Sequence, residues 1–231
     1  MASEVRRLSF SDSHLEAVVV ENAVDFRVDG IVVNLSSDPV RIGSNVPTLL
    51  PAWRSTILTD TVVRQAERLA VLRVAETKNL GGVAQRGWTW FGDVYAGFPR
   101  TTPLYVSSKD IVGQTRADPR VFSGQSVVGS QYQDFDIHLK CWWSPGQTDC
   151  FIHNEHPFME IHTQIHGLGR MQKFERNDVV SRYEDVVMAP GMTHEPFLSI
   201  QDDDGWKYPW HRYFADDESI WLAIELHPRS N

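Results

Sequence analysis

Two stretches decide the expected fold: CFIHNEHPFMEIHTQIHG at residues 150–167 and MAPGMTH at residues 188–194. Five of the nine histidines in the 231-residue chain lie in the span from His153 to His194. Neutral imidazole is the commonest protein ligand for Zn, Fe, Cu and Ni, and a carboxylate often completes the ligand set. This concentration of histidine therefore indicates a site for a divalent transition metal.

The spacing of these residues predicts how they converge. Alternate side chains of a regular strand share one direction, so Glu160, His162 and Gln164 are expected to point the same way. A glycine turn follows, and a Pro-Gly turn then precedes His194 on a returning strand. Such strands can bring their polar side chains together inside a β-barrel.

The same residues resemble the two motifs of the cupin superfamily. The family pattern is His-x-His, three or four residues, Glu, six residues and Gly, followed by Pro-x-Gly-x-x-His. His156, Glu160 and Gly167 match the first motif, and Gly191 and His194 match the second. The resemblance implies an all-β fold, a jelly-roll or double-stranded β-helix barrel, with one divalent metal. The implied metal ligands are His153, His156, Glu160 and His194.

The first histidine pair departs from the family pattern, because two residues separate His153 from His156 instead of one. Either a β-bulge turns His153 inward or Asn154 occupies the usual ligand position. The bulge is favoured, because bulges re-aim side chains next to functional sites. The second motif also departs, since it reads Ala-Pro-Gly where Pro-x-Gly is usual.

Other polar residues near these motifs are candidates for catalysis or for the substrate pocket. Glu160 is expected to act as a general base, and His162 as a proton shuttle or as a partner that orients a ligand. For His162, a barrel-wall histidine bonded to the backbone is the alternative. The residues expected to line the substrate pocket are Gln164, His138, Trp142 and Arg170.

The rest of the chain divides at residue 84. Residues 85–231 consist of short β-rich stretches between Gly, Pro, Asp and Asn, which is typical of a barrel. Residues 1–84 are expected to form an extension that packs on the barrel or adds strands to it. A helix is expected at 60–76, where Val63, Ala66 and Ala70 fall on one face, although the second half of this segment also fits a strand.

Composition restricts the partners. The formal net charge of −8 argues against nucleic acid and against a membrane surface that needs a basic face. The first residues lack an apolar signal segment, and no run of about 18 apolar residues occurs, so a cytoplasmic protein is expected. Cys141 and Cys150 are then expected to be free thiols. Cupin barrels commonly pair, so a homodimer is expected.

A site of histidines and one carboxylate leaves coordination positions open. With Fe(II), which the sequence slightly favours, dioxygenase-type oxidation of a small polar metabolite follows, making the chain an oxidoreductase. The favoured iron rests on the similarity of PGQTDCFIH (145–153) to thiol-dioxygenase-like cupins. With Zn(II), Mn(II) or Ni(II), a non-redox isomerase, cyclase or lyase follows. A non-catalytic, ligand-binding cupin is the second alternative.

Overall fold

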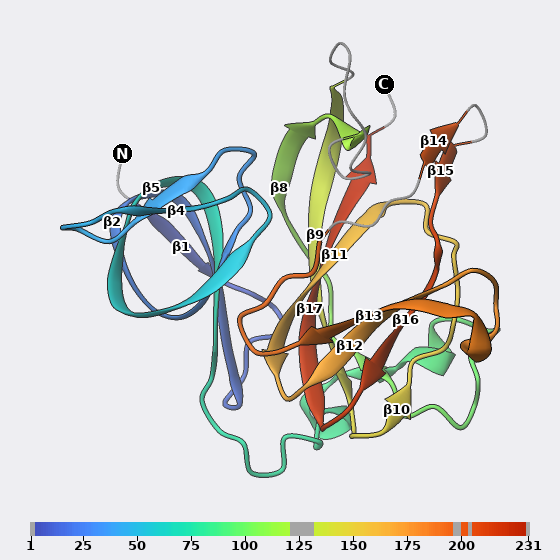
Figure 1. Ribbon diagram of the computed structural model, residues 1–231. Helices are drawn as coiled ribbons and strands as arrows, with labels where there is room; N and C mark the ends of the chain where they lie inside the picture. Colours follow the sequence, from blue (N-terminus) through green and yellow to red (C-terminus); the bar gives the residue numbers. More distant parts are fainter. Residues whose placement is uncertain (1–2, 121–131, 196–199, 203–204, 230–231) are drawn as a thin grey trace.

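The computed structural model describes residues 3–120, 132–195, 200–202 and 205–229, and these form β-strands joined by turns (Figure 1). Apart from short 3-10 turns, which include η1 (Ala84–Arg86), η2 (Phe91–Asp93) and η4 (Val179–Ser181), the described residues contain no helix. None of these turns is long or apolar enough to cross a membrane. The all-β fold class expected from the sequence is confirmed.

The N-terminal strands form a five-stranded sheet of order β1-β2-β5-β3-β4. Their bounds are β1 (Glu4–Arg7), β2 (Leu15–Asn34), β3 (Val40–Ile42), β4 (Thr48–Leu50) and β5 (Ser55–Val74). The two long strands curl on each other, because Val32 of β2 is paired with both Val71 and Thr56 of β5. They enclose a small apolar core that includes Val28, Val63 and Leu69 (blue to cyan in Figure 1).

The helix expected at 60–76 is wrong, because this segment belongs to β5. Val63 and Ala66 face the small N-terminal core, whereas Ala70 and Leu72 face the main core. A strand that passes from one core to the other loses its simple alternation, and the buried positions then imitate a helical period. Pairing with β2 along its length overrides that local pattern.

The C-terminal strands form two larger sheets. The first has the order β11-β17-β9-β7-β6, with β8 also paired to β9, and the second has the order β10-β16-β12-β13. A separate pair, β14 and β15, projects from them. The bounds in the first sheet are β6 (Thr89–Trp90), β7 (Tyr105–Val106), β8 (Asp110–Ala117), β9 (Gln133–Ser144), β11 (Met159–His166) and β17 (Ser219–Pro228). The others are β10 (Thr148–Asp149), β12 (Gly169–Phe174), β13 (Arg182–Met188), β14 (Ile200–Asp202), β15 (Gly205–Lys207) and β16 (Trp210–Ala215).

The β9–β17–β11 sheet has two different faces. On one face, Ile137, Leu139 and Cys141 of β9 join apolar residues of β2 and β5 in the main core. The opposite face looks towards the second sheet, where Tyr213 of β16 stacks on Trp221 of β17 with ring centroids 3.8 Å apart. This inner face carries most of the polar residues singled out in the sequence. Cys141 and Cys150 are both buried free thiols.

Candidate metal centre

Three histidines from two segments meet at one end of the space between the sheets. His153 and His156 lie in the connection between β10 and β11, and His211 lies on β16. His153 and His211 form an isolated antiparallel bridge, with N···O distances of 3.0 and 2.9 Å between their backbones. This bridge fixes the two ligands relative to each other. The expected β-bulge is not what turns His153 inward, because the residue follows a turn at Phe151 (φ 67°) outside any regular strand.

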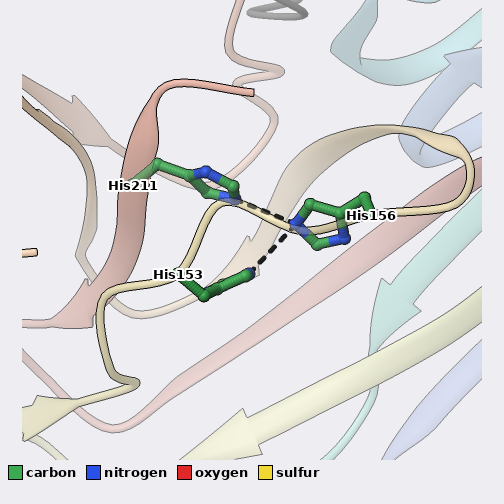
Figure 2. Close-up of side chains that lie close together, drawn as sticks. All are labelled: His153, His156 and His211. Atoms are coloured by element: carbon green, nitrogen blue, oxygen red, sulfur yellow. Dashed lines mark hydrogen bonds between the residues drawn. The ribbon is translucent and has the colours of Figure 1, made fainter. Parts of the chain in front are cut away.

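The three ring nitrogens converge closely (Figure 2). The Nε2 of His156 lies 3.0 Å from the Nε2 of His153 and 3.0 Å from the Nε2 of His211. Metal–nitrogen bonds of about 2.1 Å place neighbouring ligands about 3.0 Å apart in an octahedron and about 3.4 Å apart in a tetrahedron. The two observed separations are close enough for the three nitrogens to share one metal ion.

Hydrogen bonds on the far side of two of the three rings fix their tautomers. The Nδ1 atoms of His153 and His211 lie 3.2 and 2.8 Å from the carbonyl oxygens of Phe151 and Pro209. A carbonyl only accepts, so each Nδ1 carries the proton and each Nε2 presents a lone pair. The Nε2 of His156 can donate to only one of these two atoms. The three converging nitrogens do not carry enough protons to hydrogen-bond to one another, and such a group fits a metal ion. Backbone carbonyls are usual partners for the other ring nitrogen of a ligating histidine.

Burial keeps these imidazoles neutral. Burial, followed by the charge of His156, lowers the pKa of His153 to about 4. Burial also lowers the pKa of His156, and burial together with His153 and His156 holds that of His211 well below its usual value. All three lone pairs are thus available at neutral pH.

His211 was missed in the sequence because it lies outside the family motifs, in the aromatic segment WKYPWHRYF (206–214). Alternation in this segment does not identify it, because Trp210, Arg212 and Phe214 form a face as apolar as that of His211, Tyr213 and Ala215. The structure shows that the ring of His211 is buried.

Glu160 and His162 lie beside the three histidines on β11. An oxygen of Glu160 is 3.8 Å from the Nε2 of His156, and the other is 3.3 Å from the Nε2 of His162. Burial alone would raise the pKa of Glu160, but His162, His156 and Lys140 outweigh it and hold the pKa well below its usual range. The carboxylate is therefore ionised and in reach of the metal position, while the buried Nδ1 of His162 has no hydrogen-bond partner.

His194 is not brought into this group. Its Nε2 accepts the backbone N–H of His162 at 2.9 Å, and its Nδ1 lies 2.7 Å from the carbonyl oxygen of Glu195. Burial and the charge of His162 lower its pKa to about 3. Both ring nitrogens are thus used by the backbone, and a ligand role would require the ring to give up its bond to His162.

Only one of the four residues expected in the substrate pocket lines the cavity. Trp142 lines a cavity of about 880 Å³ next to the three histidines, whereas Gln164, Arg170 and His138 do not. Gln164 accepts the hydroxyl of Tyr213 at 2.7 Å and donates to the carbonyl oxygen of His166. Arg170 is held by Asp216 and Asp185, so it points away from the cavity towards carboxylates of its own.

His138 belongs to a second group of possible ligands with Glu225 and His227. The Nε2 of His227 lies 2.8 Å from one oxygen of Glu225, and Lys140 Nζ lies 2.5 Å from the other. The rings of His138 and His227 are stacked, with centroids 3.9 Å apart. Because a lysine and a histidine already compensate this carboxylate, the group forms a charge network, and the triad is the stronger metal candidate.

No protein-family model matches the chain, and no curated protein matches it. Solved structures similar to it include the ribosomal oxygenase YcfD from Escherichia coli, solved with cobalt and succinic acid, at 15% identity and a TM-score of 0.30; that match covers 40% of this chain and 24% of the other. An oxalate decarboxylase from Bacillus subtilis is 11% identical with a TM-score of 0.31, covering 100% of this chain and 74% of the other. A cupin 2 conserved barrel protein from Leptotrichia buccalis is 9% identical with a TM-score of 0.28, covering 97% and 88%.

The chain spans about a quarter of the length of the Escherichia coli protein and most of the other two. Similarities of this strength do not establish the family or the chemistry of this chain. The all-β fold follows from its own strands, and the case for a metal rests on its three histidines.

Proposed function

We propose that the chain is a metal-dependent cupin enzyme that binds one divalent ion through His153, His156 and His211 and oxidises a small molecule in dioxygenase-type chemistry. The observation that carries this proposal is the pair of 3.0 Å separations between the Nε2 atoms. Three histidine ligands would leave coordination positions for substrate, and an Fe(II) ion held there would supply oxidative chemistry with O₂.

The chain's own residues complete the site. The ionised carboxylate of Glu160, 8% exposed, stands beside the metal position and can take a proton from a bound substrate at its Oε2. The Nε2–H of His162 donates towards Oε1 and holds this carboxylate in place. Aromatic side chains, among them Phe91, Trp142 and Phe158, line the cavity beside these groups.

The position of Glu160 also supports a second candidate function. A buried carboxylate next to a Lewis-acidic metal is the arrangement needed to abstract a proton from a polarised substrate. A non-redox isomerase, cyclase or lyase using Mn(II), Ni(II) or Zn(II) would use the same three histidines. A non-catalytic binding protein would need neither the open positions nor Glu160.

Metal analysis of protein purified without chelators or affinity metals tests the proposal. We expect close to one equivalent of metal per chain after reconstitution with Fe(II) under anaerobic conditions. Nitric oxide, a small analogue of O₂, should then give the electron paramagnetic resonance signal of a ferrous–nitrosyl centre, because coordination positions are open. Less than about a tenth of an equivalent of any transition metal would contradict the metal site. Bound metal with no nitric oxide signal would favour the non-redox candidate.

A further inference from the structure

The wall of the cavity is aromatic on one side of the metal position. Phe91 packs edge-to-face on Trp142 with centroids 4.7 Å apart, and Phe151 stacks on the ligand His153 at 5.0 Å. Tyr95, 49% exposed, stands with Phe91 at the rim of this wall. Flat side chains of this kind bind a flat apolar ring through stacked and edge-to-face contacts.

Lys140 adds a cation to this wall. Among the described residues that line the cavity it is the only lysine or arginine. Its Nζ lies 4.8 Å from the ring centroid of Trp142 and 6.0 Å from that of Phe158, so the ammonium group is at the edge of the aromatic surface. Lys140 is directly opposite Ala223 on β17, and His162 is opposite Ala223 from the other side. The small alanine leaves room between Lys140 and the site beside the metal.

Glu225 positions this ammonium group without occupying all of its N–H donors. Its Oε1 lies 2.5 Å from Lys140 Nζ and its Oε2 accepts from His227. A lysine has three N–H donors, so two remain for another acceptor. A carboxylate on a ligand would accept from these two remaining N–H groups.

We propose that the cavity binds a small aromatic carboxylate, with its carboxylate on Lys140 Nζ and its ring against Trp142 and Phe91. The proposal rests on the proposed function for the metal beside the reacting end of the ligand, but the contact with Lys140 does not need the metal. It refines the substrate class from a small polar metabolite to a monoanion with a flat apolar body. The reacting end of the ligand then lies between Lys140 and the three histidines.

Calorimetric titration of the apo protein and the Zn(II)-loaded protein tests this, since zinc avoids turnover. The probes are benzoate, its neutral analogue benzamide, and propionate, which keeps the charge but lacks the ring. We expect benzoate to bind at least about tenfold more tightly than either. The Lys140→Met variant should lose that preference and keep the affinity for benzamide. Lys78→Met, which removes an exposed lysine, is the matched control and should leave all three affinities unchanged.

A double variant, Lys140→Met with Glu225→Gln, removes both charges of the pair and guards against a buried unpaired carboxylate. It should behave as the single variant does. Equal affinities for benzoate and benzamide, or benzoate binding that survives both variants, would overturn the proposal. If the triad binds no metal, the benzoate preference of the apo protein still reports on Lys140, so failure of the metal site and failure of the ligand class are separate results.

Discussion

At the scale of single residues, the hydrogen bond on each imidazole separates possible ligands from structural histidines. His153 and His211 donate from Nδ1 to backbone carbonyls and direct their Nε2 lone pairs towards His156 in the cavity. His194 uses its Nε2 to accept the N–H of His162. His211 and His194 are similarly buried. We nevertheless expect His211 to bind metal and His194 to have a structural role, and substitution distinguishes the two roles.

Replacing His211 by alanine should abolish metal binding. The two remaining histidines come from one irregular connection, and the backbone bridge presents His153 next to an empty position. We expect metal content below about a tenth of an equivalent, measured by elemental analysis, with the folded state retained by circular dichroism. The His166→Ala variant, which removes a histidine outside the cavity, should keep its metal.

Replacing His194 by alanine should give the reverse result. The buried N–H of His162 loses its acceptor, which costs about 1–3 kcal/mol of unfolding free energy in urea titration. The metal should remain. Loss of metal from a folded His194→Ala protein would show that this histidine is a ligand and that its ring turns when metal binds.

At the scale of elements, the turns at the ends of β11 hold the site. Gly167 joins β11 to β12 with φ at +71°, and a Cβ on this residue would meet the carbonyl oxygen of Glu218 at 2.0 Å. Strand β11 carries Glu160 and His162, so a shift of this turn moves both. The glycine of the first motif is thus required by a close backbone approach as well as by its dihedral angle.

The Gly167→Ala variant should lose more than about 2 kcal/mol of stability in urea. Gly87→Ala is the matched control, because Gly87 also has a positive φ, +87°, but has nothing within 4 Å of the added Cβ. The control should lose only the cost of the left-handed backbone, about 1–2 kcal/mol. Equal losses in the two variants would show that the contact with Glu218 is relieved at no cost.

At the scale of the whole molecule, the N-terminal strands and the C-terminal sheets share their largest core. Leu15 and Val19 of β2 belong to the same cluster as Leu139 of β9 and Ile224 of β17. An ion pair reinforces the connection, since Arg86 Nε lies 2.7 Å from Asp12 Oδ2, with side chains 12% and 22% exposed. The β9–β17–β11 sheet, whose inner face carries part of the site, is thus backed by the N-terminal sheet.

The Asp12→Asn variant should show the pH dependence of this connection. Burial would raise the pKa of Asp12, but hydrogen bonds from the backbone of Leu15 and His14, together with Arg86, lower it below its usual 3.8. A carboxyl group with a lowered folded-state pKa stabilises the fold above its unfolded value and loses that contribution as pH falls through the folded value. We expect a loss of about 1–2 kcal/mol at pH 7 and a shrinking difference from wild type below about pH 4, measured by urea unfolding. A difference that stays constant down to pH 2 would contradict the role of the charge.

The sequence by itself determined the fold class and the region of the site. Alternation in β11 and β17, glycine turns and the clustered histidines are local features, and they correctly predicted an all-β chain. The local pattern wrongly predicted a helix in β5, because a strand shared by two cores has no simple alternation of buried and exposed residues.

Only the tertiary structure decided which histidines meet. His211 is 55 residues from His156, and the bridge between His153 and His211 together with the stacking of the two sheets brings it to the triad. In the same packing, the ring of His194 accepts a backbone N–H and Arg170 forms an ion pair with Asp216. Spacing along a chain specifies directions within one strand, whereas convergence between strands depends on register and on competing hydrogen-bond partners, which no short motif contains.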